Sequence, residues 1–480
     1  MTGWLALLAA TSPFLSALTG LFYVLAAICA VREVMVSRTS QGSIAWLISL
    51  ALLPFPTVII YFIVGWKHFD DYAAVQVRGR RLSRGGRSRG IPLIDEKCNA
   101  AWPVLTGIAQ IPFLAGNEAK LLIDGQATFD SIFAGIDNAQ HYLLVQFYIV
   151  RDDALGKVLA DKLIARAQAG VSVRLLYDDI GSYGLPRRYI ERLRAAGVKV
   201  SGFNNRHRFL RLYGPTRLNY RNHRKIVVAD GREAWVGGHN VGVEYLGLDP
   251  RFGRWRDTQV HVRGPAALAC GLVFAEDWEW ATGERLQPAL PEPIETPGDQ
   301  PVLAMPSGPA DRLEDCAIAF TDVIGRARKR IWIVSPYFVP DLDVRTALYA
   351  AVLRGVEVKL LLPHKPDHLL VWLASNAHAN QMVDRGVAVH RYQDGFLHEK
   401  AILIDDAIAG LGTVNFDNRS FAINFELTLW FTGRQMIEDV EATLAVDFAN
   451  SRRTTVEDVG KLPIVSRFVG QAAKLLSPML

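Results

Sequence analysis

The chain is poor in the residues that build disulfide frameworks and metal sites. Among its 480 residues there are only 4 cysteines and no CxxC pair; the cysteines are Cys29, Cys98, Cys270 and Cys316. We therefore expect neither structural disulfides nor a zinc site of the CxxC type. No P-loop and no cluster with metal-ligand spacing occurs either, so the sequence predicts no metal and no other cofactor.

The chain also has little excess of positive over negative charge. The formal net charge is +5, from 53 Lys and Arg against 48 Asp and Glu, which is too small to argue for a nucleic-acid partner by itself. Apolar residues, by contrast, are abundant and unevenly distributed, with two long runs over 4–31 and 44–66. Each run approaches or exceeds the roughly 20 residues that cross a bilayer. The sequence therefore predicts an N-terminal transmembrane helical hairpin over 1–66.

A secretory signal is the alternative interpretation of the first run. The run lacks a basic segment before it, and the second run follows within about a dozen residues, so the hairpin is favoured. Between the runs lie Arg32 and Arg38 against Glu33, and after them come Lys67 and an acid-free arginine cluster: Arg78, Arg80, Arg81, Arg84, Arg87 and Arg89. This bias predicts that the C-terminal region faces the cytoplasm and that 67–116 is a basic juxtamembrane linker.

A short pattern, H-x-K-x4-D followed by a small-residue turn ending in Asn, occurs twice. One match is compatible with a His and a Lys on an exposed strand, but two matches with the same spacing and the same tail are not. The first copy comprises His223, Lys225, Asp230 and Asn240, and the second comprises His398, Lys400, Asp405 and Asn415.

This pattern suits the chemistry of a phosphodiester. The apolar runs 226–229 and 401–404 predict buried strands, and residues i and i+2 of a strand share a face, so each His projects with its Lys. Lysines and Asn amides stabilise the growing negative charge without a metal. Imidazole has a pKa of about 6.5, so one ring can attack while a protonated partner donates. One copy lacks the second imidazole, which favours a single site built from both copies.

The region after residue 116 is an internal duplication of alternating helices and strands. Alternation of this kind predicts an α/β fold with mainly parallel sheets covered on both faces. Helices are expected over 129–139, 155–169, 314–328 and 342–354, and strands over 142–148, 170–178, 331–337 and 355–363. The Pro-rich segment 288–301 separates a first domain, 117–287, from a second, 302–480. The apolar stretch 462–480 predicts either a helix packed on the domain or an interfacial membrane helix.

The two copies match the paired HKD motifs of the phospholipase D superfamily, and the sequence around them resembles bacterial cardiolipin synthases. The resemblance covers nearly the whole chain, with Thr413 in place of a smaller Gly or Ser as a mild departure. Supporting stretches lie at 219–222, 255–257, 335–341, 395–397 and 415–421.

The resemblance implies two phospholipase D-like α/β/α domains in a pseudo-twofold arrangement, preceded by a transmembrane hairpin in the bacterial inner membrane. It implies that His223 attacks the phosphorus while His398 acts first as acid and then as base, with the reverse assignment left open. Of the other motif residues, Lys225, Lys400, Asn240 and Asn415 would hold the non-bridging oxygens, and Asp230 and Asp405 would support the catalytic set.

Further site residues are expected only by resemblance. Glu244 and Glu426 follow the two Asn-bearing turns, and an acid near this position is expected to brace the opposite histidine. Arg256, Asp257 and Arg419 are expected near the site, although surface salt bridges would explain them equally well.

The implied reaction transfers a phosphatidyl group between two phosphatidylglycerol molecules, giving cardiolipin and glycerol. Its partners are phosphatidylglycerol and membrane lipids, and the oligomeric state is not predicted. A membrane-bound phospholipase D with water as acceptor is the alternative of the same chemistry. A nucleic-acid phosphodiesterase would show a basic groove with stacking aromatics rather than a hairpin. The last alternative is a membrane scaffold protein that has lost catalytic activity. The intact His and Lys in both copies of the motif argue against it.

Overall fold

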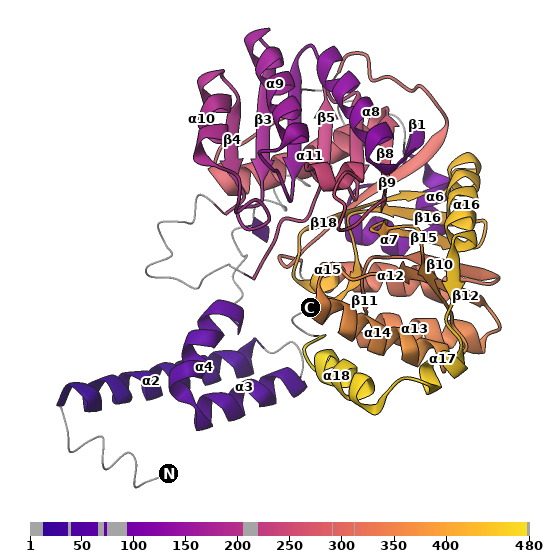
Figure 1. Cartoon of the computed structure of the whole chain (residues 1–480). Helices are drawn as coiled ribbons and strands as arrows, with labels where there is room; N and C mark the ends of the chain where they lie inside the picture. Colours follow the sequence, from indigo (N-terminus) through magenta and orange to yellow (C-terminus); the bar gives the residue numbers. More distant parts are fainter. Residues whose placement is uncertain are drawn as a thin grey trace. The chain divides into compact units, whose positions relative to one another are not determined.

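A computed structural model describes residues 13–36, 40–65, 72–73, 94–204, 219–289, 291–311 and 313–477. The chain divides into a small N-terminal helical unit and a large α/β unit that contains most of the chain after residue 68. Both units are drawn in Figure 1.

The N-terminal unit contains α2 (Pro13–Met35), α3 (Ser40–Leu52), α4 (Pro54–Ile60) and the short π-helix η1 (Tyr61–Gly65). Helix α2 is 23 residues long and largely apolar, so its length and composition are sufficient to cross a membrane. It packs on α3 and α4 through a small apolar cluster: Ala26, Cys29, Leu50, Val58 and Tyr61.

The second apolar run is divided rather than continuous. Helix α3 ends at Leu52 and α4 begins at Pro54, because a proline ring removes one backbone donor and clashes with the preceding turn. The start of the first predicted run and the flanking charges other than Arg32 and Glu33 lie outside the described residues.

The large unit is built on one 15-stranded sheet with the order β19-β13-β12-β10-β15-β16-β18-β9-β1-β8-β6-β5-β2-β3-β4. Strands of the first half are β1 (Leu114–Ile123), β2 (Tyr142–Phe147), β3 (Ser172–Tyr177), β4 (Lys199–Gly202), β5 (Ile226–Ala229), β6 (Glu233–Gly237) and β8 (Thr258–Arg263). Those of the second half are β9 (Gln300–Ser307), β10 (Arg330–Val334), β12 (Glu357–Pro363), β13 (Ala388–Tyr392), β15 (Ala401–Ile404), β16 (Ile408–Gly412), β18 (Glu426–Phe431) and β19 (Ser451–Arg453). The halves join where β1 pairs with β9.

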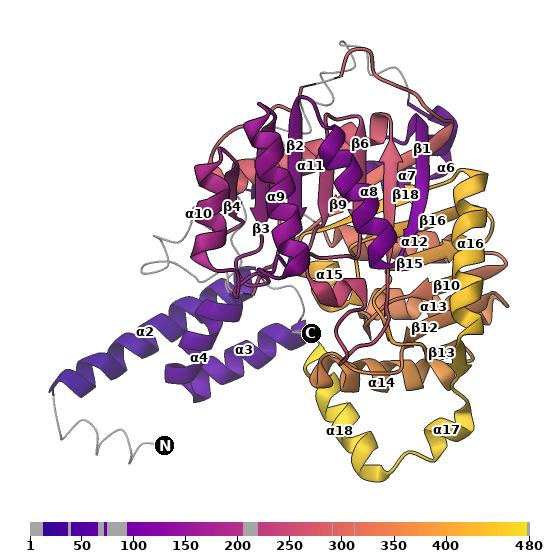
Figure 2. The same ribbon diagram turned by 45° about the horizontal axis from the view of Figure 1, so that its top comes forward.

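Helices cover the sheet. The first half carries α8 (Asp124–Asn138), α9 (Ala154–Gln168) and α10 (Arg187–Ala195) on one face and α11 (Pro265–Thr282) on the other (Figures 1 and 2). The second half carries α12 (Asp315–Arg326), α13 (Leu342–Leu353), α14 (Leu369–Val383) and α16 (Arg434–Ala449). The chain closes with α17 (Val456–Gly460) and α18 (Ile464–Lys474).

The α/β class is confirmed, but the prediction of mainly parallel sheets is wrong. Among the described strands of the large sheet, pairing is parallel only within β2-β3-β4 and β10-β12-β13. The other neighbours are antiparallel, among them the hairpins β5-β6 and β15-β16, whose turns begin at Asp230 and Asp405. Both aspartates have a left-handed backbone, with φ of 54° and 51°, as such tight turns require.

The compact region also begins earlier than residue 117. Helices α6 (Glu96–Ala101) and α7 (Pro103–Ala109) precede β1, and Trp102, Leu105 and Phe113 are buried in the main core. This segment lacks a long periodic pattern, so its place in the core depends on contacts with distant elements.

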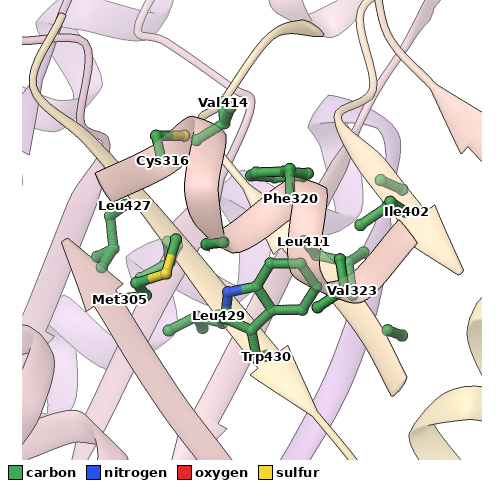
Figure 3. Packing of buried hydrophobic residues seen from close by; sticks show 14 of the residues in the cluster. Met305, Cys316, Phe320, Val323, Ile402, Leu411, Val414, Leu427, Leu429 and Trp430 are labelled. Atoms are coloured by element: carbon green, nitrogen blue, oxygen red, sulfur yellow. The ribbon is translucent and has the colours of Figure 1, made fainter. Parts of the chain in front are cut away.

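Hydrophobic packing holds β15, the strand that follows the second His-x-Lys motif, in place. Figure 3 shows side chains of α12 gathered with those of β9, β15, β16 and β18. The Phe320 ring lies 5.3 Å from Trp430. Gly410 has to lack a side chain, because a Cβ there would come within 2.7 Å of the Trp430 ring. Val414 belongs to the same cluster and directly precedes Asn415, so the core anchors this turn.

Candidate active site

The structure brings the two motifs together at the seam between the halves. Each His-x-Lys directly precedes its strand, β5 or β15, and each histidine is held by the backbone of the other half. The His223 amide donates to the Phe425 carbonyl at 2.9 Å, and the His398 amide donates to the Arg256 carbonyl at 2.8 Å. Next to His398, β14 (Phe396–Leu397) pairs with β7 (Trp255–Arg256).

Each histidine also contacts a carboxylate from the other half. His223 Nδ1 lies 3.0 Å from both oxygens of Glu426, at the start of β18. His398 Nδ1 lies 2.6 Å from Asp257 Oδ2, just before β8. In the two copies, therefore, a carboxylate occupies Nδ1 and orients the ring, which leaves Nε2 as the nitrogen for chemistry.

Burial disfavours the charged form of both imidazoles in the free site. It lowers the pKa of His223, and the charges of Lys225 and Lys400 act in the same direction, although Glu426 acts to raise it. Burial and the charge of Lys400 lower the pKa of His398 to about 3, although Asp257 acts to raise it. Neutral rings suit nucleophilic attack, and an anionic phosphodiester in the site would raise both pKa values.

The two lysines supply buried positive charge. Lys225 Nζ donates to the His223 carbonyl at 2.6 Å, and Lys400 Nζ lies 2.9 Å from His398 Nδ1. Burial lowers the pKa of Lys225 well below its ordinary value and that of Lys400 to about 8. Burial deprives these ammonium groups of their hydration. An anionic ligand would stabilise their charged form by direct electrostatic attraction.

The two asparagines differ in whether their side-chain amides are already hydrogen-bonded within the protein. Asn240 is engaged by the protein: its Oδ1 accepts from the Ile149 amide at 3.0 Å and its Nδ2 donates to the Tyr245 hydroxyl at 3.0 Å. Asn415 is buried, and its Oδ1 has no hydrogen-bond partner within the described part of the chain. A buried acceptor in this condition is a candidate for contact with a donor group of the substrate, such as a hydroxyl.

Asp230 and Asp405 lie at the far ends of the motif strands. The Asp230 carboxylate accepts from the amides of Gln140, His141 and Tyr142 at 2.7–2.8 Å. Asp405 does the same for residues 328–330, at 2.7–2.8 Å. Each aspartate thus fixes the start of the adjacent antiparallel strand, β2 or β10, which gives it a supporting rather than a reacting position.

The residue between His and Lys forms a buried ion pair in each copy. Arg224 donates to Asp277 of α11 at 2.7 Å and to the Ser307 carbonyl at 3.2 Å. Arg256, which was expected near the site, lies between Glu399 and Asp447 of α16, at 3.4 and 2.5 Å. These pairs tie each motif to the long helix that closes its half.

Tyr72 is a contributor that sequence reasoning missed. It is fully buried, donates to Asp277 at 2.6 Å and accepts from Arg224 at 3.1 Å. Its ring lies 4.7 Å from Phe425, whose carbonyl holds His223. An isolated Tyr carries no sequence signal of this role, which arises only from the tertiary fold.

Substituting Tyr72→Phe will destabilise the protein by roughly 1–3 kcal/mol, because a buried hydrogen bond to the Arg224–Asp277 pair is lost while the ring remains. Thermal or chaotrope unfolding of the purified chain measures this. Tyr349→Phe, on α13, is the control, and equal stability of the two variants would contradict the role of Tyr72.

The remaining expectations have mixed outcomes. Glu426 braces the opposite histidine, but Glu244 pairs with Arg151 instead, and Asp257 holds the second histidine. Gly238 permits this, because a Cβ there would come within 2.1 Å of Asp257 Oδ1. Arg419 lies close enough to Arg221 for the two charges to repel, and burial together with that charge lowers the pKa of Arg419. The described residues contain no group of 3 or more His, Cys, Asp or Glu that could hold a metal ion.

Comparison with known proteins agrees with this geometry. The family model described as "Cardiolipin synthase, PLD-like domain" matches residues 132–249 and 320–447, and the model "Phospholipase_D-nuclease N-terminal" matches 21–66. Each of the two cardiolipin synthase matches contains one His-x-Lys motif.

Similar curated proteins span the whole chain. Cardiolipin synthase A of Pseudomonas putida (strain W619) is 42% identical over 97% of this chain and 98% of its own. The enzyme of the same name from Pseudomonas aeruginosa (strain LESB58) is 42% identical, over 95% and 94%. The crystal structure of phosphatidylserine synthase from Haemophilus influenzae Rd KW20 shares the fold at 14% identity, with a TM-score of 0.61 over 79% of this chain and 99% of that one.

The paired motifs at one seam, the two family matches and the full-length relatives agree with one another. This chain belongs to the cardiolipin synthase family of the phospholipase D superfamily.

Proposed function

We propose that the protein is a membrane-bound phosphatidyltransferase that makes cardiolipin and glycerol from two molecules of phosphatidylglycerol. The observation that carries this proposal is the pair of histidines at one seam, each bound through Nδ1 to a carboxylate of the other half. Two oriented imidazoles flanked by two lysines can attack a phosphodiester from one side and protonate its leaving group on the other.

In the first step, His223 Nε2 attacks the phosphorus of the donor lipid. The bond between phosphorus and the glycerol oxygen breaks, and His398 Nε2 gives its proton to that oxygen, so glycerol leaves and a phosphatidyl-histidine remains. The anionic substrate, by raising the pKa of His398, supplies the protonated form that this step needs.

In the second step, His398 takes the proton from the terminal hydroxyl of a second phosphatidylglycerol. The resulting oxygen attacks the phosphorus, the bond to His223 breaks, and cardiolipin is released. Lys225 and Lys400, together with the Nδ2 group of Asn415, would hold the non-bridging oxygens throughout. Burial of both histidines, each 8% exposed, supports transfer to an alcohol over hydrolysis because little solvent reaches the intermediate.

The halves are further proposed to be related by a pseudo-twofold axis through the β1-β9 pair. From the outer edge inward, the first half runs β4-β3-β2-β5-β6-β8-β1 and the second runs β13-β12-β10-β15-β16-β18-β9. Corresponding strands occupy corresponding places, with β19 as an addition. Such an axis would explain why each motif receives its carboxylate from the other half.

We also propose that α2 and the α3–α4 segment form a transmembrane hairpin that leaves the catalytic unit in the cytoplasm. Helix α2 is long enough to span, and α3 and α4 pack against it. The basic residues after the hairpin favour this orientation. Anchoring would confine the enzyme to the surface that holds both substrates.

Mass spectrometry of the products tests the proposed reaction. Purified protein is mixed with phosphatidylglycerol in detergent micelles, with a chelator present. Cardiolipin and free glycerol in equal amounts are expected. Phosphatidic acid as the main product would instead make the protein a hydrolase, and no turnover would direct attention to another phosphodiester.

The rate in micelles will also depend on pH. Because the pKa of Lys400 is about 8, this lysine loses its positive charge as the pH rises through that value, so kcat/KM should fall above about pH 8. Lys400→Arg keeps the charge, so its residual activity should lack this alkaline decline. The same decline in both proteins would contradict the assignment to Lys400.

A further inference from the structure

Helix α18 carries its large apolar side chains on the outside. Ile464, Phe468 and the following Leu475 are 82%, 73% and 81% exposed, while Gly470 and Ala473 are buried. A helix that covers the core of a soluble domain has the opposite arrangement. Large apolar groups at one exposed stripe mark an interaction surface.

The helix is held firmly in this orientation. A Cβ on Gly470 would lie 3.5 Å from the Ala377 Cβ of α14, so the two helices touch through small residues. Lys474 Nζ donates to Gln381 Oε1 at 2.6 Å. Figures 1 and 2 both show α18 alongside α14. The contacts with α14 therefore keep the apolar stripe of α18 directed away from the domain.

Helix α14 extends the exposed apolar area. It begins with Leu369 and Leu370, which are 65% and 44% exposed. The segment 461–477 also contains three basic residues, Lys461, Arg467 and Lys474, and no acidic residue. Of these, Lys461 pairs with Glu457 of α17, and Arg467 and Lys474 remain as positive charges beside the apolar stripe. Such an arrangement complements the surface of an anionic bilayer.

The same helices adjoin the catalytic seam. Ser375 of α14 accepts from the Phe338 amide at 3.0 Å, in β11 (Phe338–Val339). This strand pairs with β17 (Phe416–Asp417), which directly follows Asn415. Beyond β17, Asn418 Nδ2 donates to the Ser477 carbonyl at 2.9 Å. A surface bound by α18 would thus lie next to the Asn415 turn.

We propose that α18 and the first turn of α14 form a docking face that seats the second half on an anionic lipid surface beside the active site. Headgroups then reach the Asn415 turn directly from the bilayer, without extraction of the lipid. The inference rests on the proposed function and deepens it, because it assigns the route of the lipid substrates.

A fluorescent label tests the contact in the full chain, reconstituted into phosphatidylglycerol-containing vesicles. An environment-sensitive dye is attached at Val465→Cys, and the control is Val446→Cys on α16; these valines are 72% and 61% exposed. Lipids with brominated acyl chains should quench the Val465 label about threefold more strongly than the Val446 label, since only the first enters the interface. Equal quenching of both labels by aqueous iodide, with none by brominated lipid, would overturn the proposal. The proposal would also be overturned if protection of the Val465 label from iodide increased with the protein-to-lipid ratio, because a second copy of the chain would then cover the docking face.

Activity provides the second measurement. The triple variant Ile464→Ser, Phe468→Ser, Leu475→Ser should lose about tenfold in rate on vesicles and keep its rate in mixed micelles. Leu353→Ser, at an 88% exposed position of α13, is the control and should change neither rate. An unchanged vesicle rate in the triple variant, or an equal loss in micelles, would overturn the docking role. Failure of the unmodified protein to make cardiolipin in micelles would reject the proposed reaction while the label result still decides the docking face.

Discussion

Replacing His223 by alanine will lower cardiolipin formation by about 10⁴-fold or more, and replacing His398 will have an effect of similar size. The reason is that each imidazole performs a step that no other group at the seam can perform. His223 supplies the covalent bond to phosphorus, and His398 moves the proton to and from the alcohols. The rate of cardiolipin formation in micelles measures both losses.

The matched control is His368→Ala, since this histidine side chain belongs to the second half and is 74% exposed. It should keep full activity. Circular dichroism and membrane extraction should show that all three variants remain folded and membrane-bound. Substantial turnover in either seam variant would contradict a mechanism that needs two histidines.

Removing the charge of either carboxylate will be the second large effect. Asp257→Asn and Glu426→Gln should each lower kcat by about 10²–10⁴-fold, because an amide cannot hold the imidazole in the required tautomer or stabilise its charged form. Glu244→Gln is the control, since Glu244 pairs with Arg151 and touches neither histidine.

Double variants reveal which histidine each carboxylate serves. Asp257→Asn should add little to the loss caused by His398→Ala, because groups that act as one unit are not additive. The same change should still reduce the residual activity of His223→Ala. The reverse pattern would mean that each carboxylate serves the histidine of its own half, contrary to the contacts at the seam.

Much of the fold follows from local patterns in the chain. Helix-strand alternation predicts α9, α12, α13, β2, β3, β10 and β12 close to their observed bounds. The antiparallel strands β1, β8, β9 and β18 were not predicted, because their pairing depends on residues far apart in the sequence. Burial of Trp102 and Tyr72 likewise depends on contacts that no local pattern records.

The motif residues were found from the sequence because their spacing repeats. The carboxylates were harder to assign, since Glu426 lies 11 positions after Asn415 in one half while Asp257 lies 17 after Asn240 in the other. Glu244 was expected as the partner because it follows the first Asn-bearing turn, only 4 positions after Asn240. Only the pairing of β7 with β14 brings Asp257 to His398.

The most direct test of a single two-histidine site is a burst experiment with a phosphatidyl ester of p-nitrophenol. This leaving group needs no acid, so His398→Ala should release about one equivalent of nitrophenolate per site and then stop, with the phosphatidyl group on His223. His223→Ala should give no burst. A burst from His223→Ala alone would reverse the roles of the two histidines, and the absence of a burst from both variants would contradict the covalent mechanism.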